Sequence, residues 1–145
     1  MDELTAMHIS GSALKAERAR LNIAAMNLAN ANTTRTLEGG PYKAKSVIFA
    51  AKPLTEGSFR DTLNSTAERL RTVEVVKVVE DKAPFTEVFD PSHPDADANG
   101  IVRMPNVNVA EQMVDMMSAK RSYEANVAAL DAVKNMALRA LDIGR

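Results

Sequence analysis

The stretch from Asn106 to Arg145 constrains the fold of this chain more than any other part of it. Asn108 precedes Glu111 by three positions, which is the spacing of a capping box at a helix N-terminus. No Gly or Pro follows until Gly144, which acts as a stop signal. A helix that ends at Ile143 would be roughly 50 Å long, far more than the usual three turns. The sequence therefore predicts one long C-terminal helix.

This predicted helix carries two apolar stripes. Alternating steps of four and three residues select a coiled-coil seam that two lysines interrupt: Val109, Met113, Met116, Lys120, Tyr123, Val127, Leu130, Lys134, Ala137 and Leu141. The opposite face carries small residues instead of the usual Lys and Glu: Ser118, Ser122, Ala125, Ala129 and Ala132. Small side chains let a second backbone approach closely, so we expect neighbours on both faces. The alternative is that alanine serves here only as a good helix former.

The N-terminal segment, Leu4 to about Ala31, is also predicted to be helical. Leucine or methionine recurs every seven residues, at Met7, Leu14, Leu21 and Leu28. Ser10–Ser12, which contains Gly11, is a place where the helix could bend or begin late. Asn27, Asn30 and Asn32 cluster near the end of the helix. Asparagine is a poor interior helix residue, so these amides indicate either specific hydrogen bonds or simple fraying.

The middle of the chain lacks helix signals. Glu38–Pro41 predicts a turn, and Pro53–Thr66 reads as a loop. Strands are predicted at Tyr42–Lys52, Leu70–Val79, Phe85–Phe89 and Ile101–Met104. The predicted fold class is mainly α: two long terminal helices pair as an α-helical coiled coil, with a small β element and extended linkers between them. The expected domains are 1–34 and 106–145, which form one helical domain, and a linker and β-hairpin region at 35–105.

Composition excludes several classes of protein. The formal net charge of -1 gives no basic excess for nucleic acid or an anionic membrane. There is no cysteine, hence no disulfide, thiol chemistry or cysteine-bound zinc. The sequence contains no run of about 18 apolar residues, so no transmembrane helix is predicted. The residues Met1–His8 lack the basic and apolar regions of a secretory signal, so we expect any export to use another route.

Two segments resemble sites of chemistry only in part. Asp95–Gly100 matches the first half of an EF-hand loop, but Asn106 stands where the bidentate Glu is needed. The alternatives are a weak calcium site and an acidic solvated turn. His93 lies beside Ser92 and near Asp90, yet neighbours in an extended loop point in different directions and lack an oxyanion hole. We therefore predict no enzyme, no catalytic residue, no metal and no cofactor.

Several segments resemble the bacterial flagellar axial proteins, the family of rod, hook and related subunits. The resemblance begins at Asn27–Thr33 and is equally strong at Asn106–Met117 and Arg121–Asn126. Asn32–Tyr42 and Asp90–Gly100 resemble the proximal-rod subunits of that family. The resemblance covers nearly the whole chain and is least characteristic at Pro53–Arg71.

The resemblance implies a structural subunit of the flagellar basal-body proximal rod. Such subunits polymerise through their terminal helices into a torque-transmitting drive shaft. The implied partners are copies of the chain itself, the rod proteins FlgB and FlgF, the adaptor FliE and the flagellar type III export apparatus. The implied location is the periplasmic rod, reached without a cleaved signal peptide. The competing interpretation is a self-contained helical adaptor or export chaperone with one solvated helix face.

Residues expected at subunit interfaces come from both helices. On the N-terminal helix and the turn after it they are Leu14, Leu21, Asn27, Leu28, Asn30 and Asn32. On the C-terminal helix they are Met113, Met116, Met117, Tyr123, Ala125, Asn126, Val127, Ala129 and Leu130. We expect the three asparagine amides to fix the register of the assembled subunits.

Overall fold

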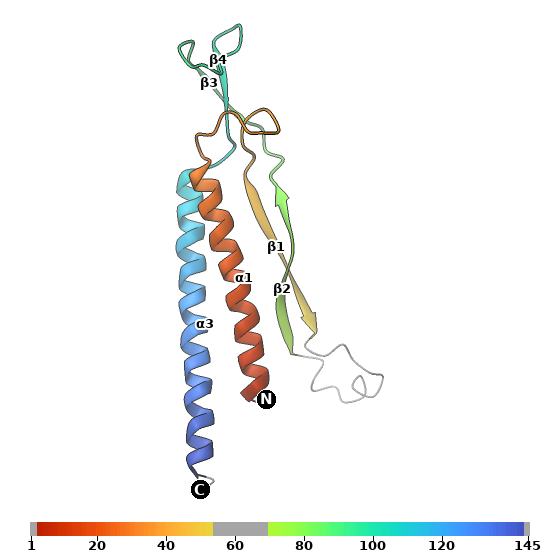
Figure 1. Cartoon of the computed structure of the whole chain (residues 1–145), viewed down its shortest axis with the longest axis vertical. Coiled ribbons are helices and arrows are strands. Elements are labelled where there is room, and N and C mark those ends of the chain that lie inside the picture. The colour runs from red at the N-terminus through yellow and green to blue at the C-terminus, as the bar shows by residue number, and fades with distance from the viewer. Residues whose placement is uncertain (1–2, 54–69, 144–145) are drawn as a thin grey trace. The chain divides into compact units, whose positions relative to one another are not determined.

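The computed structural model describes residues 3–53 and 70–143. Within these residues the chain forms two helices and four strands, in the order α1 (Glu3–Ala29), β1 (Lys45–Pro53), β2 (Arg71–Glu80), β3 (Thr86–Phe89), β4 (Ile101–Met104) and α3 (Val109–Ile143) (Figure 1). The prediction of a mainly α chain with a small β component is confirmed. Apart from Pro53, which ends β1, the predicted loop at 53–66 lies outside the described residues.

The long C-terminal helix begins where its capping signal predicts. The Asn108 side-chain oxygen accepts hydrogen bonds from the amides of Ala110 (3.1 Å) and Glu111 (3.4 Å). These bonds satisfy two of the amides that lack a partner in the first turn. The helix then continues without interruption to Ile143.

Helix α1 begins early and passes through its predicted weak point. It starts at Glu3, so a late start after Gly11 is wrong. The Ser12 hydroxyl donates to the carbonyl of Ile9 at 2.7 Å, a local bond to the backbone that the helix accommodates. After Ala29 the chain turns, and the Asn30 side chain donates to the Met26 carbonyl at 2.9 Å. The Met26 carbonyl also accepts from the backbone amide of Asn30 at 3.1 Å, so the side chain adds a second donor at the helix C-terminus.

The strands form two separate pairs. β1 pairs with β2, and the two strands run in opposite directions (Figure 1). β3 pairs with β4 in antiparallel register, with Thr86 opposite Met104 and Phe89 opposite Ile101. A two-stranded ribbon buries little by itself.

The chain divides into two compact units, and each long helix contributes to both. The first unit comprises Met1–Ala19, Ile48–Lys77 and Ala119–Arg145. Ala16 and Ala119 are buried in it, and the Ser12 hydroxyl accepts a hydrogen bond from the Val73 amide at 3.2 Å. Small side chains therefore form the buried part of this unit.

The second unit comprises Arg20–Val47 and Val78–Ser118. The side chains buried in it are Ala24, Asn27, Tyr42, Ala44, Val102 and Pro105. Arg20 of α1 pairs with Asp115 of α3, and Asn27 of α1 bonds Gln112 of α3. Because the contacts advance along α1 while they retreat along α3, the two helix segments run antiparallel in this unit.

The covered face of α3 differs from the predicted seam. Val109, Met113, Val127 and Leu141 are exposed, whereas Ala119 has no exposed surface. Met116, Tyr123, Leu130 and Ala137 of the predicted seam are partly covered. The covered face is thus rotated away from the large side chains toward small and polar ones, and a coiled coil stays a prediction. No helix among the described residues has the length and apolar character needed to cross a bilayer.

Candidate functional site

The most elaborate polar arrangement in the described chain surrounds Asn27, in the last turns of α1. Its amide nitrogen donates to the carbonyl of Lys45 (2.7 Å) and to the side-chain oxygen of Gln112 (2.9 Å). Its amide oxygen accepts from the hydroxyl of Tyr42 and from the amide of Lys45, both at 2.9 Å. A side-chain amide offers two donors and two acceptor lone pairs, so all four are used. Asn27 is 1% exposed, and a group left unpaired there would cost about 1–3 kcal/mol.

A second asparagine holds the same segment from another side. Asn106, two residues before the N-cap of α3, accepts from the amide of Ala44 at 2.8 Å. Its side-chain nitrogen donates to the carbonyl of Ala83 at 3.1 Å. The carbonyl of Ala44 accepts from the amide of Asp81 at 2.7 Å. We call Asn27, Tyr42, Asn106 and Gln112 the asparagine clamp.

The asparagine clamp joins four parts of the chain that are far apart in sequence. The end of α1, the entry to β1, the exit from β2 and the start of α3 meet at Ala44 and Lys45. Each contact uses a backbone group or an amide with strict geometry, and buried polar groups in such networks are costly to displace. The arrangement is therefore suited to fixing positions and holds no group poised for catalysis.

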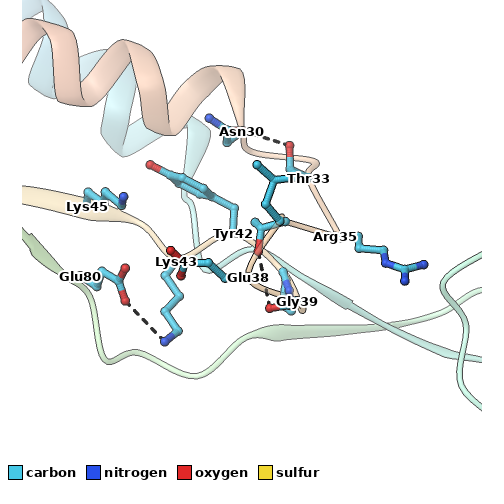
Figure 2. Close-up of a pocket in the computed structure, with 12 residues that line it drawn as sticks. Asn30, Thr33, Arg35, Glu38, Gly39, Tyr42, Lys43, Lys45 and Glu80 are labelled. Carbon is cyan, nitrogen blue, oxygen red and sulfur yellow. Dashed lines mark hydrogen bonds and ion pairs between the residues drawn. The ribbon is translucent and has the colours of Figure 1, made fainter.

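Charged side chains lie near Tyr42 of the clamp, among them Lys43, Lys45 and Glu80 (Figure 2). Burial, and then the nearby Glu80 carboxylate, raise the pKa of the Tyr42 phenol. Lys43 forms an ion pair with Glu80 at 3.4 Å, and the Lys45 ammonium lies 6.0 Å from the centre of the Tyr42 ring. Burial and the Glu80 carboxylate therefore favour the neutral phenol, which is the form that can donate to Asn27.

A tight loop beside the clamp presents one apolar side chain to solvent. The Thr36 amide donates to the Gly40 carbonyl at 2.9 Å, and Gly39 and Gly40 have φ of 87° and 78°. Only glycine adopts such φ values without strain. Leu37, on this loop, is fully exposed at 109%. The hollow beneath the loop is open and lined by groups of both charges (Figure 2), so it resembles no cofactor site.

The acidic turn at Asp90–Gly100 uses its side chains to bond itself. The Asp97 carboxylate accepts from the amides of Asn99 (2.8 Å) and Ile101 (3.0 Å), and these two bonds lower its pKa. Within residues 3–53 and 70–143 no group of three metal-binding side chains lies close enough to hold an ion. The carboxylate of Asp97 is thus engaged by the backbone of its own turn.

The serine and histidine of this turn do not form a catalytic pair. The Ser92 hydroxyl donates to Asp90 at 2.6 Å, and this bond lowers the pKa of Asp90. The His93 Nδ1 atom accepts from the amide of Asp95 at 3.1 Å. The hydroxyl and the imidazole thus have different partners, and the triad requires them to bond each other.

The structure distributes the predicted interface residues among three environments. Asn27 lies inside the chain. Partly covered are Leu14, Leu21, Leu28, Asn30, Met116, Tyr123, Asn126 and Leu130. Exposed are Asn32, Met113, Met117, Ala125, Val127 and Ala129. The exposed group is free to meet another subunit, whereas Asn27 can act on assembly only through the shape of its own chain.

The sequence did not predict the partners of Asn27. Tyr42, Asn106 and Gln112 were not singled out as members of one site. The clustered asparagines near both helix ends were the signal, since Asn27 and Asn106 each flank a predicted helix boundary. Without the fold, nothing in the sequence joins Asn27 to Gln112, which is 85 positions away.

Comparisons with known proteins point to one family. A family described as "Flagella basal body rod protein" matches residues 7–35, and one described as "Flagellar basal body rod FlgEFG protein C-terminal" matches residues 98–143. The chain is 43% identical to flagellar basal-body rod protein FlgC of Salmonella typhimurium strain LT2, over 98% of each protein. It is 42% identical to FlgC of Bacillus subtilis strain 168, over 98% of this chain and 100% of that one. The identity to FlgC of Borreliella burgdorferi is 38%, over 99% of this chain and 98% of that one.

Proposed function

Because this chain belongs to the FlgC family of flagellar basal-body rod proteins, which are structural subunits and not enzymes, we propose that it forms part of the proximal rod. In this proposal it polymerises with itself and with other rod proteins into the drive shaft that transmits torque. The observation that carries the proposal is the exposed apolar surface of α3. Met113, Val114 and Met117 are each about half exposed or more, and Leu138 and Leu141 are also exposed.

Exposed apolar side chains of this number on one helix are expected to be covered in the working protein. Monomeric proteins rarely leave large contiguous apolar surfaces in water. Beside them, Ala125 and Ala129 are exposed and present no long side chain. A neighbouring backbone could approach closely there and gain dispersion contacts. Torque would then pass through many tightly packed contacts between subunits.

We further propose that α1 and α3 pair as a coiled coil in the rod. The antiparallel contacts Arg20–Asp115 and Asn27–Gln112 support this pairing at one end of the helices. In this proposal 1–34 and 106–145 act as one helical domain, and 35–105 supplies the linkers and β-hairpins. The interface residues are those of the exposed and partly covered groups given above.

The proposed neighbouring proteins and the proposed export pathway are inferred from membership of the FlgC family. We propose FlgB, FlgF and FliE as neighbours, together with further copies of this chain. We also propose export through the flagellar type III apparatus to the periplasmic rod, without a cleaved signal peptide.

Deletion of the gene, followed by electron microscopy of purified basal bodies, tests the proposal. We expect rings without a rod, and restoration of the rod by the intact gene. A complete rod and hook in the deletion strain would contradict the proposal and favour a helical adaptor or export chaperone.

A point substitution tests the small face of α3. Ala125→Leu should place a bulky side chain where a neighbour approaches, and should reduce motility and rod assembly. Ala125→Ser is the matched control, because it keeps the side chain small. Ala129→Leu and Ala129→Ser repeat the comparison one turn further. Wild-type assembly by both leucine variants would show that this face is open to solvent.

A further inference from the structure

We infer that the amide pair between Asn27 and Gln112 sets the axial register of α1 against α3. Register here means which turn of one helix lies beside which turn of the other. The inference concerns the single chain, so it does not depend on the proposed role in the rod. It identifies Asn27 and Gln112 as positioning residues.

Apolar packing alone selects the register poorly at this end of the helices. Met26 of α1 and Met113 and Met117 of α3 are exposed, so they add little packing between the two helices. Met116 is partly covered, but methionine is flexible and fills gaps of many shapes, so it packs nearly as well after a slide of one turn. Ala24 is buried but presents a smooth, small surface. A second determinant is therefore needed.

The ion pair between Arg20 and Asp115 is a weak determinant. The two side chains are 31% and 35% exposed. A partly exposed arginine can follow its carboxylate through a shift of several ångström, because its stem is long and flexible and water competes for the charges. The ion pair therefore helps to select the faces of α1 and α3 that meet, but it constrains the axial offset of the two helices only weakly.

The amide pair between Asn27 and Gln112 constrains the axial offset more strongly than the ion pair does. The Asn27 side chain is short and buried, and its other three hydrogen bonds tie it to Lys45 and Tyr42. The one hydrogen left over points to the side-chain oxygen of Gln112 at 2.9 Å. A slide of α3 by one turn, about 5 Å, would move this acceptor out of reach and leave a buried donor unpaired. A single buried asparagine fixes register in coiled coils by the same physics.

Distances between two spin labels in the full chain test the inference. The sequence has no cysteine, so two engineered cysteines are labelled uniquely. Asn22→Cys and Ala110→Cys use exposed positions in the second unit. The labels are offset along the helix axes by roughly 10 Å, so an axial slide changes their separation directly. We expect one narrow distance in the otherwise wild-type chain.

Removal of the amide should abolish the single register. Gln112→Met keeps the length of the side chain and removes the acceptor, so we expect a broad or two-peaked distribution with unchanged helical circular dichroism. Gln112→Glu keeps an acceptor oxygen and should restore the narrow peak. Asn30→Leu is the matched control, because the Asn30 amide bonds only within the end of its own helix and turn. It should leave the distance unchanged.

Three outcomes would overturn the inference. The first is a narrow wild-type distance in a folded Gln112→Met chain. The second is the absence of any defined distance in the wild-type chain, which would mean that neighbouring subunits set the register. The third applies if the Gln112→Met chain loses its helical circular dichroism. In that case the double variant Asn27→Leu with Gln112→Leu, which pairs two apolar side chains, replaces it. A single wild-type distance in the double variant would contradict the inference.

Discussion

Tyr42 is the residue whose ionisation the asparagine clamp opposes most directly. Its hydroxyl must keep its proton to donate to Asn27, and burial raises its pKa above the ordinary value of 10.0. A phenol whose pKa is raised on folding stabilises the fold fully below about pH 10, and that contribution is lost as the pH rises through the folded pKa. We therefore expect alkali to weaken the fold through Tyr42.

Tyr42→Phe tests this expectation. At neutral pH the variant should lose about 1 kcal/mol in the free energy of unfolding, the usual value of one hydrogen bond. Above about pH 10 the stability of the wild-type chain should fall toward that of the variant. Denaturant titrations at several pH values measure both. Tyr123→Phe is the control, since the Tyr123 hydroxyl has no hydrogen bond within the described residues. A constant gap between wild type and Tyr42→Phe across this pH range would contradict the assignment.

Gly100 occupies a backbone position in the turn before β4 that favours glycine. Its φ is 75°, and an added Cβ would lie 3.0 Å from Pro91 and 3.1 Å from Phe89. Gly100→Ala should therefore destabilise the turn before β4 by about 1–2 kcal/mol from the backbone conformation alone. Gly11→Ala is the control: it lies inside α1 with open space around it and should not destabilise. Thermal unfolding of the two variants gives the comparison, and equal effects would contradict it.

Two boundaries followed from local chemistry and could be predicted, whereas the strand predicted to begin at Tyr42 begins at Lys45. Asn108 caps α3 as its spacing to Glu111 indicated, and the strand predicted at Ile101–Met104 has those bounds. The covered face of α3 could not be predicted in the same way. A heptad pattern assigns the largest side chains to the interior, whereas here Ala119 is buried and Met113 is exposed. The pattern does not distinguish large side chains that pack within the chain from large side chains that stay on its surface.

Ala119 marks the side of α3 that packs within the chain. Its side chain has no exposed surface, so Ala119→Leu must displace its neighbours and should cost about 1–3 kcal/mol in stability. Ala125→Leu on the exposed face should change the stability of the isolated chain by about 0.5 kcal/mol or less. Urea unfolding of both variants distinguishes the two faces. Equal destabilisation would show that Ala125 is also packed within the chain.

At the scale of the whole molecule, the two compact units cut across the helices. The sequence divides the chain at residues 34 and 106, where helix signals stop and start. The unit boundaries fall instead inside α1, after Ala19, and inside α3, after Ser118. A helix pattern is continuous through these points, so only tertiary contacts reveal them. The asparagine clamp lies in the second unit, and its partners Asn106 and Gln112 are distant in sequence from Asn27. Hydrogen bonds between residues so distant in sequence cannot be predicted from local sequence patterns.

This organisation predicts uneven protection of the isolated chain. The second unit joins four segments through the hydrogen bonds of Asn27, which is buried and fully paired, and of the partly covered Asn106. In the outer ends of the helices, 4–10 of α1 and 130–142 of α3, no side chain is fully buried within the chain. A helix end without packing frays, because helical propensity alone is marginal in water. In dilute monomer, hydrogen exchange should therefore be slow around Asn27, Lys45 and Gln112 and fast at both outer ends.

Assembly should change this pattern at the ends and leave the clamp as it was. If neighbouring subunits cover Met136, Leu138 and Leu141, which are exposed in the single chain, exchange at 130–143 should slow in purified basal bodies. Residues around the clamp should show little change, because their bonds already form within the chain. Strong protection of 130–143 in the dilute monomer would mean that the helix ends are stable without neighbours, and the exposed side chains of α3 would then need no rod to cover them.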